Sequence, residues 1–176
     1  MSQQKSVGQA QITLIRDDLT ALEVDAFVFY AQHDLALGSG FGTAISLRGG
    51  KGVSEELEDK GPLKTTEALV SGAGNMKAKY IIHAVGPRFQ EEDMEGKLRT
   101  TMQNCLKQAD EKGIERVAFP PMGAGFYGVP LDLCARVMIE TLKDHLANGS
   151  RIKEAIICVM DKRELAPFQA QLSSLS

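Results

Sequence analysis

A glycine-rich turn between an expected strand and an expected helix constrains this chain more than any other feature. The turn is Gly123-Ala124-Gly125-Phe126-Tyr127-Gly128; an apolar run ends before it at Phe119, and a helical pattern follows Pro130. Glycines adopt positive φ angles and let the main chain approach a ligand closely. Exposed N–H groups and the dipole of the following helix then favour an anion. The segment therefore predicts a phosphate-binding loop.

A second glycine-rich turn supports the same prediction. Gly38-Ser39-Gly40-Phe41-Gly42 follows another apolar run, Val24 to Tyr30, and it also has an aromatic residue between glycines. Either turn alone is compatible with an ordinary tight turn. Two such turns in one small domain indicate a ligand with two phosphates, or one diphosphate gripped from both sides.

Strand and helix patterns alternate along the chain. The expected strands are 11–15, 24–30, 68–72, 79–85, 114–119 and 155–160. The expected helices are 43–59, 94–112, 131–146 and 164–172, the first of them broken at Gly49-Gly50. This alternation predicts an α/β sandwich with a ligand site in the loops at the carboxyl ends of the strands.

Composition excludes several classes of function. A net charge of -3 argues against a general electrostatic grip on nucleic acid, which needs a basic face. No apolar stretch is long enough for a transmembrane helix, and the polar N-terminus has no signal-peptide core, so the cytoplasm is the expected compartment. Cys105, Cys134 and Cys158 are expected to be buried thiols. His83 is expected to be a satisfied core histidine, and no metal or cofactor is expected.

The sequence context argues against two common nucleotide-binding motifs. The turn from Gly123 to Gly128 formally matches G-x-G-x-x-G, but a Rossmann unit would place an acidic residue at the end of the next strand, about 20 residues on. That region is an expected helix, in which Glu140 and Asp144 are solvated charges. Gly50-Lys51-Gly52 lacks the Ser or Thr of a Walker loop.

The order of the elements and motifs resembles a macro domain, the ADP-ribose-binding module. The matching pieces are Ile15-Arg16-Asp17-Asp18-Leu19-Thr20, similar to the family's Gly-Asp-Ile-Thr; Val24 to Val28; Leu35 to Ile45; Ile81 to Pro87; and Ala118 to Pro130. The last two motifs are the most specific. The resemblance implies a three-layer α/β/α sandwich with a mixed central sheet, in a single domain over residues 1–176 with its core at roughly 10–160.

The resemblance also implies which residues hold the ligand. Asp18 would accept a hydrogen bond from the adenine amino group, with the main chain of Leu19 beside it. The alternative for Asp18 is a turn cap, a role that Asp17 could fill instead. The implied loop residues are Gly38, Ser39, Gly40, Phe41 and Gly42 for phosphate and distal ribose, Gly123, Ala124, Gly125 and Phe126 for the diphosphate, and Tyr127 or Phe126 against the distal ribose. The alternative for Tyr127 is a core aromatic.

The chain departs from the family where hydrolysis would be catalysed. Hydrolytic macro domains usually carry Asn-Ala-Ala-Asn after the second strand, where this chain has Phe29-Tyr30-Ala31-Gln32, and an Asp after the glycine run, where it has Gly42. Gln32 can replace an amide hydrogen bond but not a carboxylate. His33 and Asp34 are nearby candidates for a base, and their plainer interpretation is exposed loop polarity, with Asp34 initiating a turn.

Two classes of function follow from this resemblance. The first is a module that binds free ADP-ribose or ADP-ribosylated protein, with weak or no turnover. The second is a hydrolase of ADP-ribose derivatives, such as O-acetyl-ADP-ribose, ADP-ribose 1''-phosphate or mono-ADP-ribosyl-protein, with an atypical first loop. An unrelated nucleotide-sugar or phosphate-ester enzyme is a third, distant alternative. The missing asparagine and acidic residue favour the first class. No membrane partner is expected in any of these cases.

Overall fold

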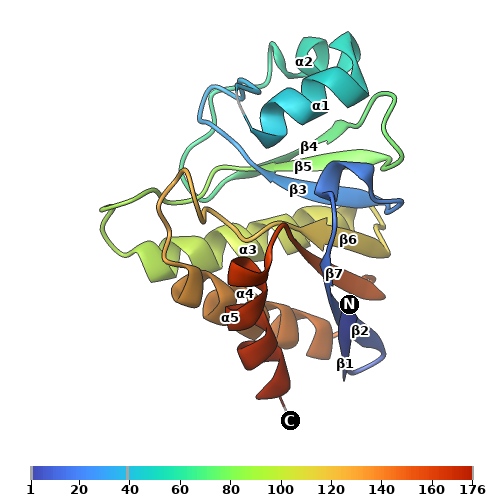
Figure 1. Ribbon diagram of the computed structural model, residues 1–176. Helices are drawn as coiled ribbons and strands as arrows, with labels where there is room; N and C mark the ends of the chain where they lie inside the picture. Colours follow the sequence, from blue (N-terminus) through green and yellow to red (C-terminus); the bar gives the residue numbers. More distant parts are fainter. Residues whose placement is uncertain (1, 39, 176) are drawn as a thin grey trace.

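The computed structural model describes residues 2–38 and 40–175, and it shows a seven-stranded sheet between two layers of helices (Figure 1). The strands are β1 (Ser2–Val7), β2 (Ala10–Arg16), β3 (Ala26–Tyr30), β4 (Ala68–Gly72), β5 (Tyr80–Ala84), β6 (Arg116–Phe119) and β7 (Glu154–Val159). The helices are α1 (Phe41–Gly49), α2 (Lys51–Leu57), α3 (Met94–Glu111), α4 (Leu131–Ala147) and α5 (Lys162–Ser173), with a 3-10 turn, η1 (Leu19–Ala21). The predicted three-layer sandwich is confirmed.

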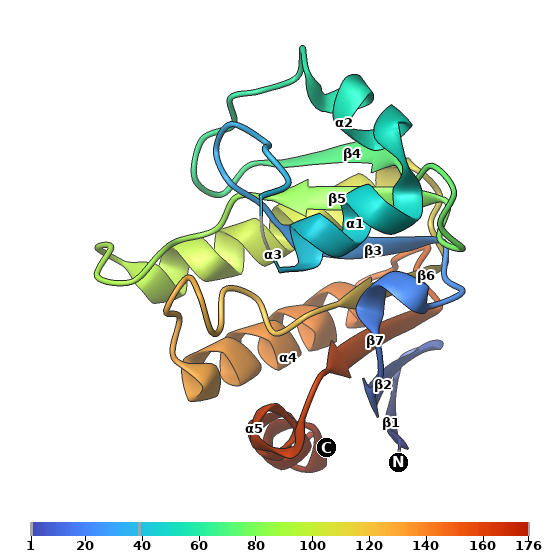
Figure 2. The same ribbon diagram turned by 45° about the horizontal axis from the view of Figure 1, so that its top comes forward.

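The strand order sets the position of any ligand site. The sheet runs β1-β2-β7-β6-β3-β5-β4, and it is mixed because β1 and β4 pair antiparallel with β2 and β5. The strands β2, β7, β6 and β3 are neighbours and run parallel. Their carboxyl ends therefore form one row along an edge of the sheet, and Figure 2 shows β3, β6 and β7 pointing the same way.

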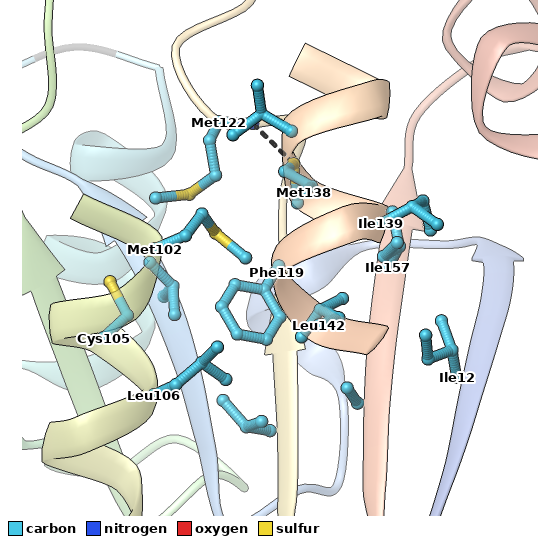
Figure 3. Close-up of a cluster of buried hydrophobic side chains, with 14 of the residues drawn as sticks. Ile12, Met102, Cys105, Leu106, Phe119, Met122, Met138, Ile139, Leu142 and Ile157 are labelled. Carbon is cyan, nitrogen blue, oxygen red and sulfur yellow. Dashed lines mark hydrogen bonds between the residues drawn. The ribbon is translucent and has the colours of Figure 1, made fainter. Parts of the chain in front are cut away.

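Each face of the sheet carries its own apolar core. Alternate residues of a strand point to opposite faces, so Val28 and Phe119 join the core under α3, α4 and α5, whereas Phe27 and Phe29 join the core under α1 and α2. In the first core Phe119 lies among side chains from two helices and a neighbouring strand (Figure 3). The fully buried β3 matches the apolar run that predicted a central strand.

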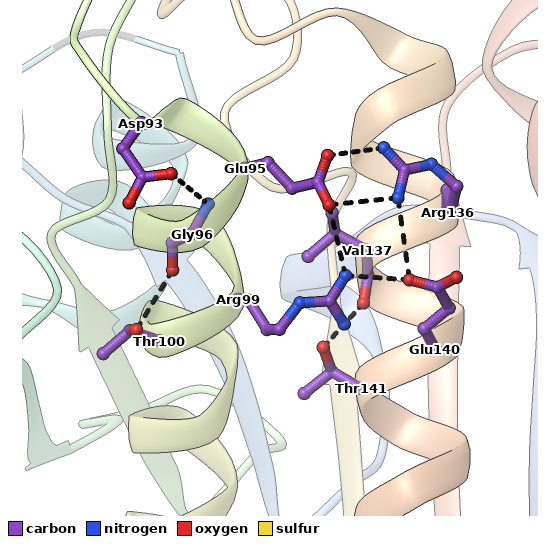
Figure 4. Close-up of polar contacts among 9 residues, drawn as sticks. All are labelled: Asp93, Glu95, Gly96, Arg99, Thr100, Arg136, Val137, Glu140 and Thr141. Carbon is purple, nitrogen blue, oxygen red and sulfur yellow. Dashed lines mark hydrogen bonds and ion pairs between the residues drawn. The ribbon is translucent and has the colours of Figure 1, made fainter.

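Helices α3 and α4 are also joined at their surface by a network of ion pairs (Figure 4). Glu95 pairs with Arg136 at 2.7 Å and Arg99 at 3.6 Å, and Glu140 pairs with Arg99 at 2.8 Å. All of these side chains are partly exposed, so each pair contributes little by itself. The network joins the N-terminal half of α3 to the middle of α4.

Several boundaries differ by one or two residues from those expected, and three differences have a clear physical cause. The strand β1 was not predicted, because its sequence is polar; it is an edge strand that pairs only with β2, through a two-residue turn in which Gly8 has φ of 60°. The strand β6 begins at Arg116 and not at residue 114, since the Asp25 carboxylate accepts the N–H groups of Glu115 and Arg116, each at 3.0 Å. Helix α5 begins two residues early, because Asp161 caps it.

His83 is fully buried but only half satisfied, which corrects the expectation of a satisfied core histidine. Its Nε2 lies 2.8 Å from the Ser71 hydroxyl, and its ring meets Phe29 edge-on. Within the described part of the chain, its Nδ1 has no hydrogen-bond partner. Burial lowers the pKa of His83 to about 4, so the imidazole is neutral at pH 7.

The three cysteines are buried and carry no disulfide, as predicted. Burial raises the pKa of the Cys105 thiol to about 12, which leaves it protonated and unreactive. Between residues 2 and 175, Ser39 aside, no helix is both long enough and apolar enough to cross a membrane. Nor do three or more metal-ligating side chains gather anywhere in that part of the chain.

Candidate ligand-binding site

A cleft follows the row of strand ends and consists of two connected hollows. The first hollow is lined by Asp17, Asp18, Gly40, Phe41, Ala44 and Met160. The second hollow is lined by Phe29, Tyr30, Gln32, Leu37, Phe41, Pro120, Pro121, Gly123, Ala124, Phe126, Tyr127, Met160 and Glu164. Phe41 and Met160 border both hollows, so together they form one elongated site. The site lies at the strand carboxyl ends, where the alternation of strands and helices placed it.

The first hollow opens beside Asp18, which also caps η1. Its Oδ1 accepts the Thr20 N–H at 3.0 Å and the Thr20 hydroxyl at 2.8 Å. Its Oδ2 accepts Arg48 Nη2 at 2.9 Å, in an ion pair with both side chains about half exposed. The cap is therefore Asp18 and not Asp17, whose carboxylate instead accepts the Asp18 N–H at 2.7 Å. Capping occupies Oδ1 and leaves Oδ2 at the surface of the hollow.

Leu19 contributes to this end through its main chain alone. Its side chain is buried in the core under α1 and α2. Its N–H has no acceptor among the described residues, although the neighbouring N–H groups of Asp18 and Thr20 are both bonded.

The first glycine-rich loop leads directly into α1. Gly38 and Gly40 have φ of 55° and 64°, and Gly40 precedes the helix without any side-chain cap. Ser39 lies outside the described residues. Phe41 borders both hollows. The loop therefore leaves the start of α1 open toward the cleft.

Gly42 is buried in the first turn of α1 and has no room for a side chain. A Cβ there would lie 1.3 Å from the Leu37 carbonyl oxygen. The family's acidic residue therefore cannot simply be restored in this backbone. The main chain of Leu37 occupies the space that such a side chain would need.

In the second glycine-rich loop, Gly123 to Gly128, different physical constraints require glycine at different positions. A Cβ on Gly123 would lie 2.5 Å from Val129 and 2.8 Å from the Tyr30 ring, so this glycine is needed for packing. Gly125 has φ of 80° and only open space around its missing Cβ. Gly125 is therefore favoured by its backbone conformation and not by packing.

Main-chain N–H groups of this second loop are free to bind an anion. The Ala124 and Gly128 N–H groups donate within the loop. Over residues 2–38 and 40–175, those of Gly125, Phe126 and Tyr127 meet no protein acceptor. Successive free N–H groups in a turn form a concave site for an anion.

The two aromatic residues of the second loop differ in their burial. Tyr127 is half-buried, and its ring packs against Tyr30, with centroids 5.1 Å apart, and under Arg88 at 5.3 Å. Phe126 is 89% exposed and stands edge-on to Tyr127. Burial raises the pKa of the Tyr127 hydroxyl, which stays protonated at neutral pH. Both rings line the second hollow.

Tyr30 explains two of the motifs that carried the resemblance. Its ring lies where a side chain on Gly86 or Gly123 would be, and its hydroxyl donates to the Pro87 carbonyl. Burial raises the pKa of this hydroxyl far above its ordinary value. Tyr30 thus joins the loop after β5 to the loop after β6, as a structural side chain that also lines the cleft.

Of the three candidates for catalysis, only Gln32 lines the cleft as the described residues form it. His33 Nδ1 lies 2.8 Å from the Leu63 carbonyl oxygen, so this nitrogen carries the proton and the ring holds the following loop. Asp34 accepts the Ala36 N–H at 2.9 Å, which confirms the prediction that it initiates a turn. Neither His33 nor Asp34 is placed as a base.

Several lining residues were not predicted, and the side of the cleft that follows β7 was missed altogether. Met160 and Glu164 follow β7, at 60% exposure for Met160, and both line the second hollow. The signal was present, since the strand-end rule applies to β7 as it does to β3 and β6. Glu164 is also the only carboxylate among the lining residues of the second hollow.

Comparison with known proteins identifies the fold family. The model of the Macro domain family matches residues 30–138. A macro domain-containing protein of Caldanaerobacter subterraneus is 38% identical over 171 residues, covering 94% of this chain and 97% of that protein. The O-acetyl-ADP-ribose deacetylase 1 of Pantoea vagans is 32% identical over 157 residues, covering 86% and 92% of the two chains.

Solved structures share the fold at lower identity. The macrodomain of Oceanobacillus iheyensis with ADP superposes with a TM-score of 0.93 at 20% identity, covering 98% of this chain and 95% of that one. The macrodomain of Trypanosoma brucei in complex with ADP-ribose gives a TM-score of 0.85 at 23% identity, covering 90% and 68%. With the family model and close relatives over nearly the whole length, the chain belongs to the macro domain family.

Proposed function

We propose that this protein binds ADP-ribose, free or attached to protein, across the row of four strand ends, with slow or no turnover. The observation that carries the proposal is the cleft itself, which runs past the ends of β2, β7, β6 and β3. Neighbouring strands lie about 4.8 Å apart, so the row spans roughly 14 Å. ADP-ribose has four parts in line: adenine, ribose, diphosphate and distal ribose. Related proteins whose structures hold ADP or ADP-ribose share the fold.

The proposed orientation places adenine in the first hollow. Asp18 Oδ2 has a second lone pair beyond its contact with Arg48, and it can accept a hydrogen bond from the adenine amino group. The free N–H of Leu19 supplies a donor beside it for a ring nitrogen. An acceptor next to a donor matches the edge of adenine that carries the amino group.

The diphosphate lies between the two glycine-rich loops in this proposal. The free N–H groups of Gly125, Phe126 and Tyr127 face it from one side. The uncapped start of α1 faces it from the other, where the helix dipole favours negative charge. Tyr127, Phe126 and Gln32 then surround the distal ribose in the second hollow.

Weak or absent turnover follows from the same geometry. Attack of water on the distal ribose usually needs a group that accepts its proton. Phe29 and Gly42 hold the family positions and offer no acceptor, and Gln32 orients water without deprotonating it. General acid–base help is worth about 10²–10⁴-fold in rate. The alternative, a hydrolase of ADP-ribose derivatives, is favoured by the relative named O-acetyl-ADP-ribose deacetylase.

A turnover assay separates these two proposals. We expect removal of ADP-ribose from a modified aspartate or glutamate, and deacetylation of O-acetyl-ADP-ribose, to be slower than that of a competent macro-domain enzyme by about 10²-fold or more at saturating substrate. Binding of ADP-ribose by the same preparation, measured by thermal shift, is the control for a folded site. Turnover equal to the reference enzyme would establish the hydrolase instead.

The proposal also includes a place in the cell. We place the protein in the cytoplasm, where buried thiols such as Cys105, Cys134 and Cys158 stay reduced. Its partners in this proposal are the small molecule ADP-ribose and proteins that carry it. The net charge of -3 does not support general binding of nucleic acid.

A further inference from the structure

We propose that Glu164 recognises the ribose hydroxyls of the adenosine half of the ligand and makes the site selective against nucleotides that carry a 2′-phosphate. The inference rests on the proposed binding of ADP-ribose and assigns a specificity to one part of that site. It starts from Glu164, the one charged side chain among the described residues that line the second hollow.

The order of the strands places Glu164 between two parts of the ligand. It follows β7, which lies between β2, with Asp18 at its end, and β6, with the second glycine-rich loop at its end. Its Oε1 accepts the N–H of Met160 at 2.8 Å, and Met160 borders both hollows. The carboxylate is thus held at the junction of the hollows. The part of ADP-ribose between adenine and diphosphate is the adenosine ribose.

One oxygen of this carboxylate is left for a ligand. The Glu164 N–H donates to Asp161 at 2.9 Å, and Oε1 is bonded to Met160, in an arrangement that caps the start of α5. Among the described residues, Oε2 has neither a hydrogen bond nor an ion pair. An ionised carboxylate only accepts hydrogen bonds. Ribose hydroxyls can donate hydrogen bonds to this carboxylate. A phosphate is negatively charged at neutral pH, so the carboxylate would repel it.

The charge around this point is negative. Asp17 and Asp18 line the first hollow and Glu164 lines the second, so three carboxylates border the cleft. Two arginines oppose these carboxylates: Arg48 pairs with Asp18 at 2.9 Å, and Arg16 Nε donates to the Met160 carbonyl at 3.2 Å. A 2′-phosphate would meet Arg16 as well as the carboxylates, so the experiment includes both residues.

Calorimetric titration of wild-type protein with three nucleotides tests the inference. We expect 2′-deoxy-ADP-ribose to bind about 10- to 100-fold more weakly than ADP-ribose, the usual effect of losing a hydrogen bond to a charged group. ADP-ribose 2′-phosphate should bind at least as weakly as the deoxy compound. Glu164→Gln still accepts the Met160 N–H through its amide oxygen, but it presents a donor in place of Oε2. This variant should weaken ADP-ribose and bring the three affinities close together.

The outcomes are distinguishable from a role in helix capping and from failure of the proposed function. A Glu164→Gln variant that melts early and binds all three nucleotides more weakly by one common factor makes Glu164 a cap only, and overturns the inference. Tighter binding of the 2′-phosphate, lost in Arg16→Gln, overturns it in favour of Arg16. If wild-type protein binds no ADP-ribose at all, the proposed function fails, and the inference fails with it.

Discussion

Single residues in this site carry a structural and a binding role at the same time, and Asp18 is the clearest case. One of its oxygens caps η1 through Thr20, while the other is shared with Arg48 at the edge of the first hollow. Substitution by alanine would remove both roles together. Asparagine separates them, since its carbonyl oxygen is also a good cap.

Asp18→Asn should therefore weaken ADP-ribose binding without loss of folding. The amide nitrogen replaces Oδ2, so a donor faces the adenine amino group and the hydrogen bond is lost. We expect affinity to fall by about 10- to 100-fold and the melting temperature to stay close to wild type. Arg48→Gln is the control, because it removes the ion pair, which is exposed and weak, but keeps the carboxylate. Normal binding by Asp18→Asn would leave Asp18 with the cap alone.

A second prediction concerns Gly125, for which the chain offers a matched control. Gly125 and Gly113 have φ of 80° and 69°, and neither has an atom within 3.4 Å of its missing Cβ. Alanine in a left-handed conformation costs about 1–2 kcal/mol, so Gly125→Ala and Gly113→Ala should lose similar stability in denaturant unfolding. Only Gly125→Ala should lose ADP-ribose affinity in calorimetry, because its methyl group enters the space proposed for the diphosphate. Equal affinities of the two variants would contradict a phosphate cradle at this loop.

At the scale of whole elements, most of the fold could be predicted from the sequence and part of the site could not. A continuous apolar run in the sequence predicts a buried strand such as β3. The pair Gly49-Gly50 predicts the break between α1 and α2. The strand β1 could not be seen in this way, because an edge strand needs no apolar face. Glu164 was missed because a carboxylate in the first turn of a helix is ordinary in sequence, and only the strand order places it in a cleft.

The roles of single loop residues also could not be predicted from the sequence alone. Gly123 and Gly125 are alike in sequence, and only the position of Tyr30 shows that the first is needed for packing. The missing carboxylate at Gly42 could be inferred from the resemblance. The sequence could not show that the Leu37 carbonyl fills the place of this carboxylate, because that contact depends on the path of the main chain.

The pairing of β4 and β5 carries a pH-dependent contribution to stability through His83. Its folded pKa of about 4 lies below the ordinary value of 6.5, so the unfolded chain binds more protons between these values. Stability from this source is fully present above pH 6.5 and falls as the pH drops toward 4, by up to about 3 kcal/mol. His83→Gln keeps a partner for Ser71 and does not titrate. We expect the difference in unfolding free energy between wild type and His83→Gln to shrink over this range in urea titrations.

Parallel pH profiles of the two proteins would contradict this account of His83. Other groups that titrate in the same range, such as carboxylates, affect both proteins equally and cancel in the comparison.

At the scale of the whole molecule, the strand order arranges residues that are far apart in the sequence into one linear site. Asp18, Glu164, Ala124 and Gln32 line the cleft and come from four different connections, and the strand order β2-β7-β6-β3 sets their order along it. A ligand that engages more of these strand ends should bind more tightly. The central claim is that affinity depends on how many strand ends a ligand reaches and on the order of the binding groups along the cleft. Fragments of ADP-ribose can test this claim.

Calorimetric titration of wild-type protein with AMP, ADP and ADP-ribose, alongside NAD, tests this claim most directly. In the proposed orientation AMP engages chiefly the ends of β2 and β7, ADP adds the loop after β6, and ADP-ribose adds the end of β3. We predict that affinity rises in that order and that ADP-ribose binds most tightly of the four, with NAD weakened by the nicotinamide at the distal ribose. Equal, weak binding of all four nucleotides would contradict the account.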